Sequence, residues 1–258
     1  PNTERSYEMI GTLISDARRA CMIDWSAIVD RTRHIRRPAQ WGSPADIVES
    51  CADQFNIDRW DGQYYRPEVW IEKDALVGVL EVACAKWFIP YFSCRGYVSD
   101  SEVWSSGQRF ASIIEGGQTP IVFHLGDHDP SGIDMSRDIE DRLSLFAGAE
   151  IQVRRIALTM DQIDQYAPPP NPAKTTDSRF KSYQEAYGDE SWELDALDPE
   201  TITDLIAHHI GPLVNGKLWE RKAKEVNAGQ KSLRTVATQW EAAHDAAAAA
   251  QPKRKRQK

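Results

Sequence analysis

The sequence predicts an α/β protein in which a parallel sheet follows a smaller, mainly helical segment. From residue 67 onwards, short apolar runs alternate with longer segments of helical periodicity, which favours a parallel sheet over an antiparallel one. Two of the apolar runs end in acidic residues, and short apolar runs are typical of strands buried inside a sheet. Ligands of open α/β sheets collect at the carboxyl ends of the strands, so we expect the functional site there.

The segment from residue 1 to about 66 is predicted to be a small, mainly helical domain. Its first helix is indicated by apolar residues at helical spacing, namely Tyr7, Ile10, Leu13, Ile14 and Ala17. A short helical or turn element is expected from Asp24, and another helix from Ala45 to Phe55. The polar and aromatic stretch 58–67 is interpreted as the linker into the next domain.

The second domain, 67–212, is expected to supply the sheet. Its predicted strands are 68–71, 91–94, 120–125 and 150–158. The predicted helices between them are 74–88, 99–114 and 131–146, with Ser99 or Asp100 as the cap of the second. The proline-rich stretch near 166–190 is interpreted as a long loop insertion, and 192–210 as an ordered segment. Residues 213–258 are expected to form a charged helical extension with a basic tail.

Composition limits the classes of function. The net charge of −8 argues against a protein that coats nucleic acid nonspecifically, although arginines crowd the N-terminal segment. Arg31, Arg33, Arg36 and Arg37 are the strongest candidates for DNA contacts, and a solvated, salt-bridged face is the alternative for the wider arginine-rich segment. The four cysteines show no zinc spacing, and no apolar run would span a bilayer. We expect a cytoplasmic, nucleoid-associated protein without a membrane partner.

Three acids follow the predicted strands. Glu72 ends the first apolar run, and Asp127 and Asp129 end the run 120–125. Alternate side chains of an extended strand share a face, so Asp127 and Asp129 are expected to point the same way. Carboxylates suit Mg²⁺, and the helix after Pro130 would aim its first amides at phosphate oxygens. The alternative is that acids after strands only cap helices, as Asp129 is placed to do.

The motifs around these acids resemble the Toprim domain of topoisomerases, primases and some nucleases. The matching residues are Trp70-Ile-Glu72-Lys73 and Gly126-Asp-His-Asp-Pro-Ser-Gly132. The Pro-Ser-Gly ending and the stretch 94–99 are most similar to the topoisomerase VI A subunit and its meiotic recombination relatives. The stretch 192–197, Trp-Glu-Leu-Asp-Ala-Leu, resembles a segment of phage and bacterial proteins of that branch, and the likeness covers roughly residues 1 to 210.

The resemblance implies a Toprim fold preceded by a winged-helix-like DNA-binding domain. It also implies Mg²⁺ as the cofactor, with Glu72, Asp127 and Asp129 as catalytic and metal-binding residues, and DNA as the substrate. Lys73 and Arg95 are expected to contact phosphates of the DNA. Enzymes of this branch are dimers, so a homodimer is expected, while the existence of an ATPase B-type partner subunit stays open.

One feature of the branch is missing. Its enzymes attack DNA with a tyrosine in an arginine-rich Tyr-Tyr motif of the preceding domain, and this sequence has no such motif. Tyr7 lies on an apolar stripe and is expected to pack in the core, while Tyr64 and Tyr65 lie in the linker. The attacking tyrosine either lies upstream of Pro1 in a longer chain or is absent.

Three functions therefore remain open. The first is Mg²⁺-dependent DNA breakage or strand passage like that of the topoisomerase VI A subunit. The second is a Toprim nuclease, in which the same acids activate water and no tyrosine is needed. The third is a non-catalytic DNA-binding module, in which the acids hold a structural metal ion or cap helices.

Overall fold

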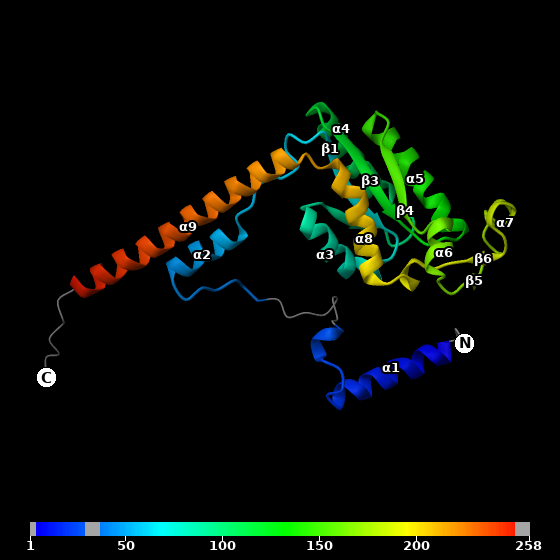
Figure 1. Ribbon diagram of the computed structural model, residues 1–258, viewed down its shortest axis with the longest axis horizontal. Coiled ribbons are helices and arrows are strands. Elements are labelled where there is room, and N and C mark those ends of the chain that lie inside the picture. Colours follow the sequence, from blue (N-terminus) through cyan, green and yellow to red (C-terminus); the bar gives the residue numbers. More distant parts are fainter. Residues whose placement is uncertain (1–3, 29–36, 251–258) are drawn as a thin grey trace. The chain divides into compact units, whose positions relative to one another are not determined.

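The computed structural model describes residues 4–28 and 37–250 of the chain. Contacts within the chain divide it into two compact units, Pro1–Ile47 and Val48–Lys258. In the described ranges, no helix is both long and apolar enough to cross a membrane. Each unit is a separate body, and the second contains the sheet (Figure 1).

The first unit contains helix α1 (Glu4–Arg19), the short 3-10 helix η1 (Trp25–Ala27) and the start of α2 (Pro44–Gln54). Its described residues, 4–28 and 37–47, form no strand, so they show the helical part of the expected domain and no wing. The guanidinium of Arg18 joins α1 to η1, because Nη2 donates to the carbonyl oxygens of Trp25 and Ile28. The expectation that Tyr7 packs in the core is wrong, since 66% of Tyr7 is exposed.

The second unit is an α/β fold built on four parallel strands, as predicted. The strands are β1 (Tyr65–Ile71), β2 (Tyr91–Ser93), β3 (Thr119–Leu125) and β4 (Gln152–Ala157). They lie in the order β2-β1-β3-β4, and every neighbouring pair is parallel. The two strands that precede acids, β1 and β3, are therefore adjacent at the centre of the sheet.

Helices cover both faces of the sheet (Figure 1). Helices α3 (Val77–Trp87) and α8 (Pro199–Ile210) pack on one face, and α4 (Asp100–Glu115) and α5 (Pro130–Ala147) on the other. Alternation along β1 follows this division, because Val69 and Ile71 belong to the first apolar core and Trp70 to the second. Both faces of the central strands are buried, which explains why their sequences are nearly continuous apolar runs.

The remaining elements connect and extend this core. They are η2 (Asp74–Leu76), α6 (Met160–Tyr166), β5 (Asn171–Pro172), α7 (Phe180–Tyr187), β6 (Glu190–Ser191), η3 (Leu194–Ala196), η4 (Gly211–Leu213) and α9 (Gly216–Ala250). The long helix α9 confirms the predicted charged helical extension, and it contacts the end of α2, where Gln230 donates to the carbonyl oxygen of Phe55. Asp53 and Arg234 add an ion pair there.

The stretch 166–190 is more ordered than the predicted long loop. It contains α7, and β5 pairs antiparallel with β6 at its ends. Tyr183 of α7 is buried, and its hydroxyl donates to the carbonyl oxygens of His128 and Glu190. These long-range contacts stabilise a helix of only eight residues, which is too short to be stable on its own sequence.

Candidate functional site

The carboxyl ends of β1 and β3 bring Glu72 and Asp127 into contact. Glu72 directly follows β1, and its backbone N–H donates to the carbonyl oxygen of Leu125 at the end of β3, over 2.9 Å. The backbone N–H of Asp127 donates in turn to Oε2 of Glu72, over 3.0 Å. The two acids that were expected to meet at this edge of the sheet are therefore neighbours.

Asp129 is the N-cap of α5. Its Oδ1 accepts hydrogen bonds from the backbone N–H of Gly132, over 2.6 Å, and from the hydroxyl of Ser131, over 3.0 Å. The interpretation of this acid as a helix cap is confirmed. Capping occupies one oxygen only: within the described residues, Oδ2 of Asp129, Oδ2 of Asp127 and Oε1 of Glu72 accept no hydrogen bond.

Two glycines allow the chain to pass close to these acids. A Cβ atom at Gly132 would lie 2.3 Å from the carbonyl oxygen of Asp127 and 3.1 Å from Oε2 of Glu72. A Cβ atom at Gly126 would lie 2.9 Å from the same Oε2. Any larger residue at position 132 would push the backbone of α5 away from the sheet, so this glycine is needed for the close approach.

Arg155, on β4, stabilises the turn between β3 and α5 through hydrogen bonds. Its Nη2 donates to the carbonyl oxygens of Gly126 and Asp127, and its Nη1 donates to the carbonyl oxygen of Gly132. The remaining donors go to the carbonyl oxygen of Leu158 and the hydroxyl of Ser136. All five N–H groups of the guanidinium are used without a direct bond to a carboxylate. Sequence reasoning missed Arg155, because a single arginine in a strand gives no signal of this role.

Lys73 is surrounded by acids. Its Nζ lies 3.3 Å from Oδ1 of Asp127 and 3.0 Å from Oδ1 of Asp195, and it also pairs with Glu193. Burial opposes its charge, but the hydrogen bonds with Glu193 and the charge of Asp127 outweigh this and raise the pKa of Lys73. In the chain without DNA the ammonium of Lys73 is held by these carboxylates, and the phosphate contact stays a prediction.

The segment 192–197 closes over this edge of the sheet. The backbone N–H of Leu194 donates to Oδ1 of Asp127, over 2.7 Å, and His128 pairs with Trp192 in an isolated antiparallel bridge. Glu193 and Asp195 thus join the predicted acids from a part of the chain more than 60 residues further along. Their only signal in the sequence was the resemblance of 192–197 to other proteins, which did not indicate where the segment lies.

Burial and mutual repulsion alter the protonation of the acids. Burial, followed by the charge of Asp127, raises the pKa of Glu72 to about 7. Burial raises the pKa of Asp127 to about 6, against the hydrogen bond from Leu194 and the charge of Lys73. Burial lowers the pKa of Arg155 to about 10, so its guanidinium stays charged at neutral pH. Glu72 therefore exchanges its proton near neutrality, which suits general acid or base catalysis.

Of the other predicted contacts with DNA, Arg95 follows β2, whose carboxyl end lies beside that of β1 at the same edge of the sheet. Arg95 pairs with Asp74 over 3.0 Å, and 73% of its side chain is exposed. Arg37 is exposed in the first unit, and Arg31, Arg33 and Arg36 lie outside the described residues.

Both histidines of this region are buried. His124 is fully buried on β3, with Nδ1 2.8 Å from the hydroxyl of Ser136. His128 turns away from the acids, with Nδ1 2.8 Å from the hydroxyl of Tyr183, and its ring packs on Tyr187 and Trp192. Burial lowers the pKa of His128 to about 4, so the imidazole is neutral at physiological pH.

The carboxylates of Glu72, Asp127 and Asp129 are suitable ligands for a hard cation, but they are not close enough together to bind one. Within the described residues, no three side chains of the His, Cys, Asp or Glu types are close enough to hold a metal ion. The free oxygens of Glu72, Asp127 and Asp129 are nevertheless the donors that Mg²⁺ prefers. Burial, followed by the charge of Asp127, raises the pKa of Glu72, and a cation would relieve the repulsion between the two acids. A cation would therefore have to draw these side chains closer together.

No family model, curated protein or solved structure matches this sequence. What the site does must therefore be argued from its own geometry and chemistry.

Proposed function

We propose that this chain is a Toprim-like protein that binds DNA and breaks its backbone with Mg²⁺, in the manner of the topoisomerase VI A subunit. The observation that carries the proposal is the meeting of Glu72 and Asp127 at the carboxyl edge of a parallel sheet, with Asp129 beside them. Buried like charges are costly, and proteins keep such groups together mainly where a site needs them.

Glu72, Asp127 and Asp129 would hold the metal ion through their free oxygens. Bound Mg²⁺ supplies positive charge that stabilises phosphate oxygens during displacement at phosphorus. The residues of the chain have separate tasks: Arg155 fixes the turn that carries Asp127, and Asp129 fixes the first turn of α5. A bound cation would lower the pKa of Glu72 from its value of about 7 and keep this carboxylate charged as a ligand.

A hydrolytic nuclease is the second candidate, and the state of two nearby tyrosines favours it. Burial and the hydrogen bond to Asp134 raise the pKa of Tyr97, while burial and the charge of Asp129 raise that of Tyr183. A raised pKa makes a phenol harder to deprotonate, which disfavours attack by these two tyrosines and favours water activated by a metal ion. Strand passage would instead need a tyrosine from elsewhere, a second copy of the chain and, by resemblance, an ATPase subunit.

Incubation of the intact chain with supercoiled plasmid and Mg²⁺ tests the proposal. The acid variant is Asp127→Asn with Asp129→Asn, which keeps oxygen acceptors for the N–H groups of Leu194 and Gly132. The matched control is Asp161→Asn with Asp164→Asn on α6, two exposed acids with the same kind of side chain. Products are compared with and without protease digestion.

We expect Mg²⁺-dependent breaks with the unmodified chain and the control, and a loss of at least about 100-fold in the acid variant, as is typical when catalytic groups are removed. Free DNA ends would identify a nuclease, and ends that carry protein would identify attack by a tyrosine. Breaks of equal rate in the acid variant would contradict the proposal. Binding without breaks under any of these conditions would leave the third function, a non-catalytic DNA-binding module.

A further inference from the structure

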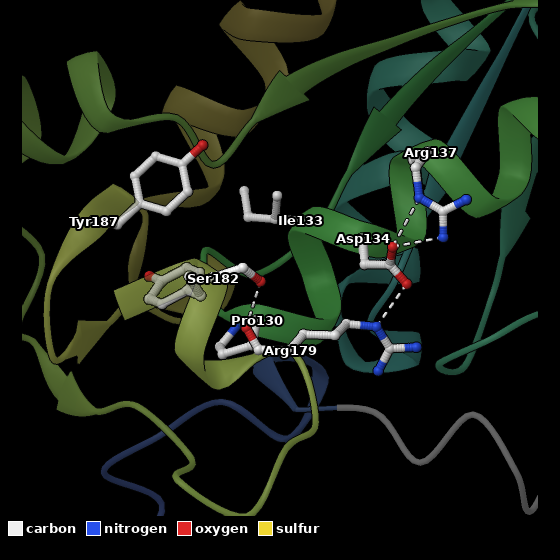
Figure 2. Close-up of a pocket in the computed structure, with 8 residues that line it drawn as sticks. Pro130, Ile133, Asp134, Arg137, Arg179, Ser182 and Tyr187 are labelled. Atoms are coloured by element: carbon white, nitrogen blue, oxygen red, sulfur yellow. Dashed lines mark hydrogen bonds and ion pairs between the residues drawn. The ribbon is translucent and has the colours of Figure 1, made fainter. Parts of the chain in front are cut away.

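A pocket of about 240 Å³ lies beside the acids, between the start of α5 and α7. Its first lining residue, Pro130, directly follows Asp129, and the charge of Asp129 acts on Tyr183 in its wall. Figure 2 shows Tyr187 on one side of the pocket and the guanidinium groups of Arg137 and Arg179 on the other, with Ile133 between them. The proposed function assigns no role to this pocket.

The aromatic side of the pocket offers a ring face. Tyr187 is 38% exposed, and its ring packs on His128, with 4.8 Å between the ring centroids at nearly a right angle. Tyr183 packs against Tyr187 and is itself held by hydrogen bonds to the backbone. The tyrosine ring is thus supported from behind, and a planar group can stack on it with little loss of side-chain freedom.

Asp134 holds two cations at the other side. Its Oδ1 accepts from Nε and Nη2 of Arg137, and its Oδ2 accepts from Nε of Arg179, over 2.7 Å, and from the hydroxyl of Tyr97. Within the described residues, Nη2 of Arg179 donates no hydrogen bond, and its Nη1 has only a contact of 3.4 Å with Asp177. Arg179 therefore keeps donors for an anion while Asp134 fixes its position.

We propose that this pocket binds one nucleotide, with the base stacked on Tyr187 and the phosphate on Arg179. An apolar, aromatic surface and a fixed guanidinium are the two groups that recognise a planar base and its phosphate. The volume lies just below the usual range of ligand sites, which begins at about 300 Å³, so the pocket can take no more than a single nucleotide unit.

The nucleotide must be unpaired, because a base within a duplex has both faces covered by its neighbours. The same chemistry could come from a free mononucleotide or from a DNA strand. The choice of a DNA strand rests on the proposed function, since the pocket begins one residue after Asp129 and would hold a nucleotide next to the cleaved one. Binding of an unpaired nucleotide in this pocket predicts that the protein prefers single-stranded or locally opened DNA.

Fluorescence anisotropy of a labelled oligothymidylate, mixed with the intact chain in EDTA, tests the inference without any cleavage. Thymidine monophosphate serves as an unlabelled competitor that represents the free nucleotide. Tyr187→Ala removes the stacking surface, and Ser182→Trp fills the pocket from an exposed position on its rim. Tyr166→Ala is the matched control, because Tyr166 is also 38% exposed and does not line the pocket.

We expect the affinity for the single strand to fall about tenfold or more in Tyr187→Ala and Ser182→Trp, and to stay unchanged in Tyr166→Ala. A duplex of the same length should bind the unmodified chain more weakly than the single strand. Asp161→Asn with Asp164→Asn, on α6 and outside the lining of the pocket, should bind the single strand as well as the unmodified chain does.

Equal single-strand affinities of Tyr187→Ala, Ser182→Trp and the unmodified chain would overturn the strand site, whatever the plasmid assay shows. If saturating thymidine monophosphate does not displace the strand from the unmodified chain, the pocket does not hold a nucleotide of the strand and the inference is wrong. If the unmodified chain does not bind the strand at all, the inference is also wrong, while plasmid breakage still tests the proposed function separately.

Discussion

Two glutamates near the carboxyl end of β1 have opposite surroundings: Glu68 lies within the strand and is buried, and Glu72 directly follows it and is half-buried. Glu68, within the strand, accepts two hydrogen bonds from the guanidinium of Arg109, each 2.9 Å long, and a third from Nε1 of Trp70. Glu72, just after the strand, accepts one backbone hydrogen bond and faces Asp127. The guanidinium that acts on Glu72 is that of Arg155. All of its donors bind carbonyl oxygens or a hydroxyl.

This difference separates an acid that stabilises the fold from one that is kept for a site. The charge of Glu68 is fully matched, so a ligand would add nothing to it. Glu72 retains one oxygen without a partner and a proton that is exchanged near neutral pH. A guanidinium bound to Glu72 in the way that Arg109 is bound to Glu68 would have removed both properties. Arg155 instead orients the turn between β3 and α5 and leaves the carboxylates available.

The largest expected effect comes from Arg155→Lys. A lysine has three donors, so at least two of the five acceptors now bound by Arg155 would lose their hydrogen bonds inside the protein. We expect the free energy of unfolding to fall by about 3–5 kcal/mol, measured by urea denaturation. Arg109→Lys is the matched control, and because 46% of the Arg109 side chain is exposed, we expect a loss of only about 1 kcal/mol. Equal losses of unfolding free energy in Arg155→Lys and Arg109→Lys would contradict this difference between the two arginines.

Glu68→Gln and Glu72→Gln should have effects of opposite sign at pH 8 in EDTA. Glu68→Gln breaks a buried, bidentate ion pair, and we expect a loss of about 2 kcal/mol. The pKa of Glu72 is about 7 in the folded chain against an ordinary value of 4.5, so the folded state binds more protons in this window and loses stability as the pH rises through it. Glu72→Gln removes that loss.

We therefore expect Glu72→Gln to be more stable than the unmodified chain by about 1–3 kcal/mol at pH 8, and nearly equal to it at pH 4.5. Denaturation curves at the two pH values measure this difference. Destabilisation by Glu72→Gln at pH 8, of the size seen for Glu68→Gln, would mean that Glu72 too is a structural acid.

Local sequence patterns were enough to predict the sheet and the meeting of the first two acids. The apolar runs before Glu72 and Asp127 identify buried parallel strands, and the carboxyl ends of such strands lie at one edge. What could not be predicted depends on contacts between distant segments. Arg155 acts through a neighbouring strand, and α7 forms because Tyr183 bonds to the turn at His128.

The partners of Lys73 also could not be predicted from local sequence patterns. Its position after β1 was predicted, but Glu193 and Asp195 reach it from a segment about 120 residues further along the chain. Such a pairing depends on where α8 and the segment before it pack, which no local pattern contains. The sequence therefore does not show that three carboxylates surround Lys73 in the fold.

Calorimetric titration of Mg²⁺ into the intact chain at pH 8 tests most directly whether the Glu72 edge is a cation site. The comparison is with Asp127→Asn, which removes the charge and keeps an acceptor for the N–H of Leu194. The account predicts saturable binding at one site in the unmodified chain and its loss in the variant. Equal binding in both proteins, or none in the unmodified chain, would contradict it.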